Sequence, residues 1–207
     1  MHDLMNRLYP ICRSITGDGL RESLRILGEK IPLEIREVPT GTRVFDWEIP
    51  KEWNISDAYV MNSDGRRVID FQSHNLHVVN YSIPVHEQMR LSELRKHLHT
   101  LPEQPDLIPY RTSYYVPQWG FCLSQNDLDT LPDDTYEVVI DSTLSEGCLS
   151  YGELLIPGRV DDEVLVSVHC CHPSMCNDNL SGMVVAAELA VHSFPTRRSS
   201  DHRKSVV

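Results

Sequence analysis

An apolar run, a short polar loop and a second apolar run follow one another near the end of the chain. The first run, residues 163–168 (EVLVSV), has the continuous apolar character of a buried strand. The second, residues 180–191, is apolar nearly all round, which favours a helix buried against a sheet. Strand, loop and buried helix in this order are typical of an α/β layer, in which ligands gather at the carboxyl ends of strands. We therefore predict an α/β fold with a site in the loop.

The preceding sequence divides into segments that differ in their pattern of apolar residues and turn signals. Residues 1–34 are expected to be mainly helical, because a turn signal at 16–19 is followed by apolar residues spaced three and four apart. Residues 35–105 contain short strand-like runs separated by turn signals and end in a proline-marked linker. They predict a small β-rich domain inserted before the α/β segment, residues 106–192.

Residues 193–207 change abruptly to basic, unpatterned sequence. The stretch SFPTRRSSD resembles the translated adapter read-through found at the ends of proteins predicted from assembled reads. We interpret this tail as non-native, and a natural basic tail is the alternative.

Composition excludes several classes of function. Lys and Arg number 19 against 30 Asp and Glu, and the net charge of −11 repels nucleic acid and anionic membrane. No apolar run approaches the roughly 20 residues of a membrane span, and the first residues lack the pattern of a signal peptide. We expect a cytoplasmic protein whose six cysteines are reduced thiols.

The loop within residues 166–182 (VSVHCCHPSMCNDNLSG) is crowded with potential metal ligands. A zinc ribbon would need a second ligand pair, and a redox centre would be expected to carry a C-x-x-C motif, so both readings are weak. A catalytic metal site is the third reading, with His172, Asp178 and His169 as candidate ligands. Imidazole nitrogen and carboxylate oxygen suit zinc. The alternative is that these are ordinary hydrogen-bonded loop residues.

Several linked motifs run along the chain: RSITGDG (13–19), VFDWEIPKEWNI (44–55), LHVVNYSIPV (76–85), IPYRTSYY (108–115), WGFC (119–122), GELLIPG (152–158) and CHPSMCNDNLSG (171–182). Together they resemble the DUF4910 aminopeptidase-like family, and NDNLSG resembles the first metal-ligand motif of M28-type zinc aminopeptidases. This resemblance implies an M28-like zinc aminopeptidase fold, truncated here, with an inserted β-rich domain known as DUF2172.

The resemblance also implies roles for individual residues. His172 and Asp178 match the family's metal ligands, and His169 stands where many M28 relatives place their first histidine. Those relatives have an Asp two residues later to orient the imidazole. Here Cys171 or Ser174 occupies the corresponding position. The resemblance implies a site that holds one or two Zn²⁺ ions. The general-base Glu and the remaining ligands of such enzymes would lie beyond residue 207.

The expected function of the full-length protein is zinc-dependent hydrolysis of peptide or aminoacyl amide bonds, with a peptide or aminoacyl substrate. The chain as given lacks the catalytic Glu and is expected to be inactive alone. The alternative is a non-catalytic module that binds a glycan or peptide in polysaccharide biosynthesis. Tyr114, Tyr115 and Trp119 either line a substrate pocket or pack in a core.

Overall fold

A computed structural model describes residues 1–158, 160, 162–194 and 205–206. The chain forms two compact units, one of residues Met1–Ile49 and Gly147–Val207 and one of residues Pro50–Glu146. The second unit is thus inserted into the first. Its boundaries differ from the predicted 35–105, because its longest strand pair joins 52–61 to 135–145, beyond the proline-marked linker. Most of the tail predicted to be non-native lies outside the described residues.

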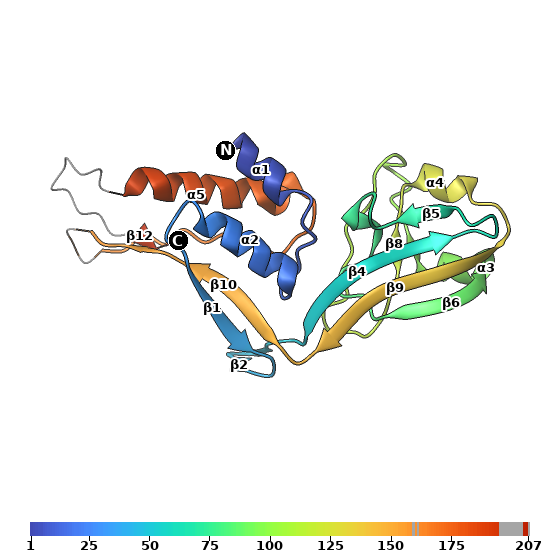
Figure 1. Ribbon diagram of the computed structural model, residues 1–207, viewed down its shortest axis with the longest axis horizontal. Helices are drawn as coiled ribbons and strands as arrows, with labels where there is room; N and C mark the ends of the chain where they lie inside the picture. The colour runs from blue at the N-terminus through green and yellow to red at the C-terminus, as the bar shows by residue number, and fades with distance from the viewer. Residues whose placement is uncertain (159, 161, 195–204, 207) are drawn as a thin grey trace. The chain divides into compact units, whose positions relative to one another are not determined.

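Helices make up much of the described part of the first unit (Figure 1). The expected helical region at the start of the chain forms α1 (His2–Leu8) and α2 (Asp18–Gly28), and the turn signal lies between them. The expected helix after the loop forms α5 (Ser181–Ser193), which continues from the π-helical segment η3 (Cys176–Leu180).

One apolar core joins these helices. Its buried residues come from all three helices and from the strand region before residue 160; they are Leu4, Leu8, Leu20, Leu24, Ile26, Leu27, Ile31, Leu154, Ile156, Leu180, Met183, Val184, Ala187 and Ala190. The apolar spacing of α2 therefore marks its buried face, as expected. The helix α5 is buried on one side only, since Val185 and Leu189 on its other side are 44% and 53% exposed.

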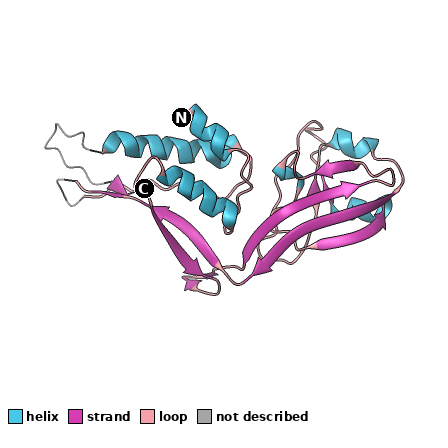
Figure 2. Ribbon diagram, in the orientation of Figure 1, coloured by secondary structure: helices cyan, strands magenta, loops and turns pink. Residues whose placement is uncertain are grey.

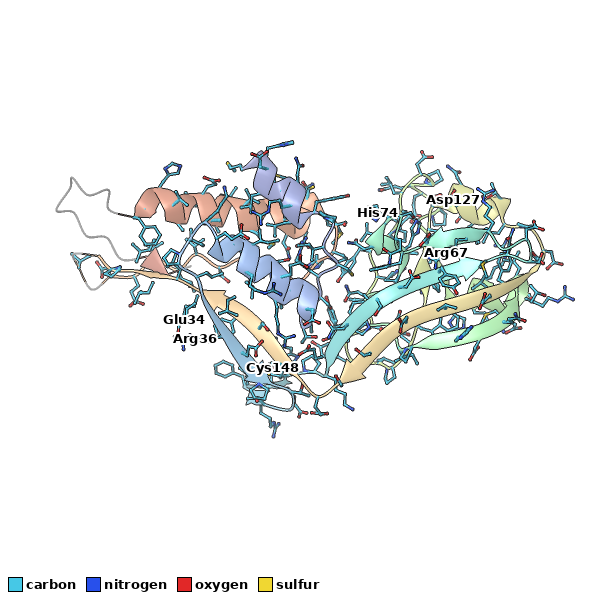
Figure 3. The ribbon with its side chains drawn as sticks, viewed as in Figure 1. Glu34, Arg36, Arg67, His74, Asp127 and Cys148 are labelled. Carbon is cyan, nitrogen blue, oxygen red and sulfur yellow. The ribbon has the colours of Figure 1, made fainter. Side chains whose placement is uncertain are left out.

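The strands of the first unit form small antiparallel pairs. They are β1 (Glu34–Pro39) with β10 (Cys148–Glu153), β2 (Arg43–Val44) with β3 (Trp47–Glu48), and β11 (Leu155–Ile156) with β12 (Ser205–Val206). On β1, Arg36 forms ion pairs with Glu34 at 2.9 Å and with Glu153 at 2.7 Å (Figure 3). Because these side chains are exposed, each pair contributes little to stability.

The prediction of a buried strand at 163–168 was wrong. The structure assigns no regular strand there, and Val164 and Leu165 are 62% and 73% exposed. A strand of continuous apolar character is buried only when neighbouring strands and helices cover both of its faces. The described residues provide no regular strand along this segment.

The second unit is centred on a four-stranded antiparallel sheet, and its long curved strands are shown in Figure 2. The strand order is β5 (Arg67–Asp70), β4 (Glu52–Met61), β9 (Thr135–Ser145) and β6 (Val85–Arg90). The remaining elements are η1 (Asn75–His77), α3 (Leu91–Leu94), η2 (Arg95–His97), β7 (Leu98–His99), β8 (Phe121–Cys122) and α4 (Gln125–Thr130). The β-rich texture expected before residue 85 is confirmed in β4 and β5.

Alternation along β9 explains how this sheet forms a core. Tyr136, Val138 and Ile140 are at most 1% exposed, whereas the residues between them are more open. This is the period of two expected for a strand with one face against a core. At one end of the sheet, the Trp53 indole donates to the carbonyl of Ser82 at 2.9 Å, which satisfies a buried polar group.

Within the described ranges, no helix is both long enough and apolar enough to cross a membrane.

The packing around residue 19, in the second position of α2, requires glycine. A Cβ atom there would lie 2.0 Å from the carbonyl oxygen of Cys12, which is backbone and cannot turn away. We expect Gly19→Ala to lower the free energy of unfolding by about 1–3 kcal/mol or more, measured by urea denaturation. Gly28→Ala is the matched control, since nothing lies within 4 Å of its added Cβ. Equal urea midpoints for Gly19→Ala and the parent protein would contradict this packing.

Candidate metal centre

The loop before α5 packs against the connector between α1 and α2. The Ser174 hydroxyl donates to the carbonyl oxygen of Tyr9 at 2.8 Å, and Ser174 is 6% exposed. This hydrogen bond joins residues 165 positions apart in the sequence. The start of the chain therefore fixes the position of the loop that carries the candidate ligands.

Arg13, in the same connector, is fully buried beside the loop. Its guanidinium donates to the carbonyl of Leu8. Burial lowers the pKa of Arg13, and the neighbouring thiols of Cys170, Cys12 and Cys171 raise it. Arginine keeps its charge even so. The sequence showed Arg13 only as the first letter of a motif, and nothing in the spacing indicated that it would lie beside the cysteine-rich loop.

The structure brings two of the three predicted ligands together. The Nε2 atom of His172 lies 3.8 Å from Oδ2 of Asp178. Ligand atoms bound to one zinc ion are about 3.4 Å apart in tetrahedral geometry and at most about 4.3 Å apart, given bonds of about 2.0–2.2 Å. The two side chains therefore fit a single ion without rearrangement of the loop.

The surroundings of His172 favour the neutral ring that a metal requires. Burial lowers the pKa of His172, the carboxylate of Asp178 raises it, and His169 and Arg13 lower it further. The net direction is downward, so the imidazole stays unprotonated at neutral pH. The Asp178 side chain is 67% exposed, so its charge remains solvated and can approach an ion from the solvent side.

Asn179 and Cys171 contact the other ring nitrogen of His172. Nδ1 lies 3.0 Å from Nδ2 of Asn179 and 3.2 Å from Sγ of Cys171. Asn179 is 6% exposed and begins the buried turn that leads into α5. Our reading of the sequence did not single out Asn179, although it is part of the NDNLSG motif.

His169 is not brought into this pair by any contact. His169 is exposed, and its electrostatic interaction with His172 lowers the pKa of His172. Across the described part of the chain, no three His, Cys, Asp or Glu side chains lie close enough to hold a metal ion. The described residues thus supply two neighbouring donors of a site that needs at least one more protein ligand.

The structure holds Cys12, Cys170 and Cys171 as free thiols of raised pKa. All six cysteines of the chain are free. Burial raises the pKa of Cys12 to about 12 and that of Cys170 to about 11, and it also raises the pKa of Cys171. These thiols stay protonated at neutral pH, and a protonated thiol is a poor nucleophile.

Comparison with known proteins identifies the family. Residues 2–203 match the model of a family described as "Domain of unknown function (DUF4910)". The chain belongs to the DUF4910 family. A relative from Clostridium acetobutylicum, "Putative polysaccharide biosynthesis protein with aminopeptidase-like domain", is 57% identical over 190 residues, covering 92% of this DUF4910 chain and 44% of the relative.

Solved structures show the fold. A crystal structure of a "putative peptidase" from Clostridium acetobutylicum matches with a TM-score of 0.95 and 53% identity, covering 99% of this chain and 48% of that one. A zinc aminopeptidase from Bacillus subtilis matches with a TM-score of 0.53 and 12% identity, covering 99% and 60%. The DUF4910 chain therefore shares the mixed α/β fold of these solved structures, and it spans about half the length of these two Clostridium relatives.

Thiol accessibility tests this description of the loop. Cys176 is exposed, whereas Cys122 is buried and Cys12 is half-buried, and desolvation raises the pKa of both Cys12 and Cys122 to about 12. We expect iodoacetamide at pH 8 to modify Cys176 first in native protein, and Cys12 and Cys122 only after unfolding. Peptide mass spectrometry of timed samples measures the order. Modification of Cys12 at the rate of Cys176 would show that the connector does not pack as described.

Proposed function

We propose that the full-length protein is a zinc-dependent aminopeptidase-like hydrolase that cleaves peptide or aminoacyl amide bonds. The observation that carries this proposal is the 3.8 Å separation of His172 Nε2 and Asp178 Oδ2 beside the start of α5. The fold shared with peptidases supports it. His169 is proposed as a further ligand, with one or two zinc ions in the complete site.

The described residues would prepare the site in three ways. Burial keeps His172 neutral, so a nitrogen lone pair is available. The exposed Asp178 supplies negative charge on the same side of the ring. The hydrogen bond from Ser174 to Tyr9 fixes the loop that carries both. When bound, zinc would act as a Lewis acid toward a substrate carbonyl.

Replacement of the proposed ligands tests the site in the full-length protein. His172→Ala and Asp178→Ala each remove a direct donor, so each is expected to weaken zinc binding by more than the roughly 10–100-fold that loss of a supporting group costs. His169→Ala is expected to have a smaller effect. Zinc content after dialysis against a zinc buffer, measured by elemental analysis, gives the result.

His192→Ala is the matched control, because His192 is exposed near the end of α5, away from the loop. Its zinc content and its turnover of aminoacyl amides should equal those of the parent protein. Equal zinc content in Asp178→Ala and the parent protein would contradict the assignment of Asp178. A parent protein that binds no zinc and cleaves no aminoacyl amide would refute the proposed function.

A second candidate function rests on a groove in the inserted unit. The groove has a volume of about 380 Å³ and is lined mainly by Tyr81, Tyr114, Tyr115, Val116 and Pro117, with Lys51 as its charged residue. An apolar, aromatic wall with few polar groups is typical of small-ligand sites. The relative's name, which refers to polysaccharide biosynthesis, supports a glycan as the ligand and a binding module as the alternative function.

The aromatic wall of this groove can be tested separately. Tyr115 is 67% exposed there, so Tyr115→Ala removes contact surface with little effect on the core. If the groove binds a glycan or peptide, the substitution should weaken binding about tenfold or more, as loss of a central aromatic contact does. Tyr151→Ala, at an exposed tyrosine of the other unit, is the control. Calorimetric titration with oligosaccharides and peptides that detects no binding would eliminate this candidate.

A further inference from the structure

The side-chain amide of Asn179 has one satisfied end and one unsatisfied end. Its Nδ2 atom lies 3.0 Å from Nδ1 of His172. Its Oδ1 atom is buried and has no hydrogen-bond partner among the described residues. An amide oxygen in a native interior is nearly always hydrogen-bonded, so an orphaned one requires an explanation.

The direction of this hydrogen bond decides which nitrogen of His172 can bind a metal. An amide nitrogen can only donate, so Nδ1 is the acceptor and a neutral ring carries its proton on Nε2. Nε2 is the atom that faces Asp178 at 3.8 Å. A protonated Nε2 can donate to the carboxylate, but it has no lone pair for an ion.

Rotation of the amide by half a turn reverses this arrangement. The oxygen then takes the place of the nitrogen near Nδ1 and accepts an Nδ1–H hydrogen bond, so it gains the partner that it lacks, while Nδ2 moves to the position that the oxygen left. The proton leaves Nε2, whose lone pair is then directed toward the side of Asp178. Metal-bound histidines usually donate their second N–H to such an acceptor, which fixes the tautomer and the orientation of the ring.

We propose that Asn179 is a positioning residue for the metal site: its side-chain oxygen accepts the Nδ1–H of His172 and so presents Nε2 to an ion shared with Asp178. The amide has two orientations, one with Nδ2 on a metal-free ring and one with Oδ1 on a metal-bound ring. This inference rests on the proposed function, because it assumes that His172 binds zinc.

Cys171 is the rival for this role, since its sulfur lies 3.2 Å from the same Nδ1 atom. Sulfur is a weak acceptor, whereas an amide oxygen is a strong one. Asn179 is also the more deeply buried of the two, and its oxygen gains a partner only in the metal-bound orientation. The geometry therefore assigns the orienting role to Asn179, and Cys171→Ala serves as the direct comparison.

The experiment uses full-length protein labelled with ¹⁵N-histidine, and it compares metal-free with zinc-loaded samples by NMR of the imidazole nitrogens. In the parent protein, we expect zinc to move the His172 proton from Nε2 to Nδ1 and to produce a slowly exchanging Nδ1–H signal. Asn179→Leu should lose this signal and bind zinc about 10–100-fold more weakly. Asn179→Asp should keep the signal and shift it downfield, because a carboxylate is the stronger acceptor.

Two controls separate orientation from stability. Cys171→Ala should keep the Nδ1–H signal, and Asn75→Leu, which removes a buried amide from the other unit, should leave the signal and the zinc affinity unchanged. An Nδ1–H signal that persists in Asn179→Leu, or that disappears in Cys171→Ala, would overturn the inference. If Asn179→Leu does not fold, an unshifted signal in Asn179→Asp would overturn it. Failure of the proposed function is distinct, because the parent protein itself would then bind no zinc.

Discussion

The candidate site depends on a contact between the two ends of the first unit's sequence. The connector after α1 and the loop before α5 meet through the hydrogen bond from Ser174 to Tyr9, and Arg13 is buried next to them. The apolar core below joins the same elements, since Leu8 and Leu180 are both fully buried in it. Any change that separates α1 from α5 would therefore also displace His172 and Asp178. The close approach of Gly19 to Cys12 lies in the same connector, so it belongs to this packing.

The two candidate ligands lie in contrasting environments, and the contrast suits the roles proposed for them. His172 is largely shielded, and burial lowers its pKa and so favours the neutral ring, whereas the side chain of Asp178 is exposed to solvent. A buried carboxylate in place of Asn179 would bring an unpaired charge into an interior position, which is costly in the absence of metal. An amide accepts the same hydrogen bond without a net charge. In the proposed site, a neutral orienting group would therefore allow the loop to fold before an ion is bound.

Some of this structure could be predicted from the sequence because the relevant signals are local. The spacing of Leu20, Leu24 and Leu27 gave the buried face of α2, and the apolar run after the loop gave α5. The pairing of His172 with Asp178 was suggested by a motif, and the structure places them together. The boundaries of the inserted unit were harder to predict, because the pairing of β4 with β9 joins residues far apart in the sequence and leaves no local signal. Asn179 was missed for a related reason, because the ring nitrogen that it contacts is identified only in three dimensions.

The segment at 163–168 shows that an apolar pattern alone fixes neither the element nor its burial, since Val164 and Leu165 are exposed. Its side chains are suited to a covered strand, yet it contacts neighbours closely only in places. One such place is Gly182 in the first turn of α5, where an added Cβ would lie 2.7 Å from Cγ1 of Val168. Glycine there allows the segment and the helix to approach each other, and this approach sets the span that the intervening loop must bridge. The glycine that ends the NDNLSG motif thus acts on the site through backbone packing. A larger residue would push Val168 away from α5 and would move the loop that positions His172.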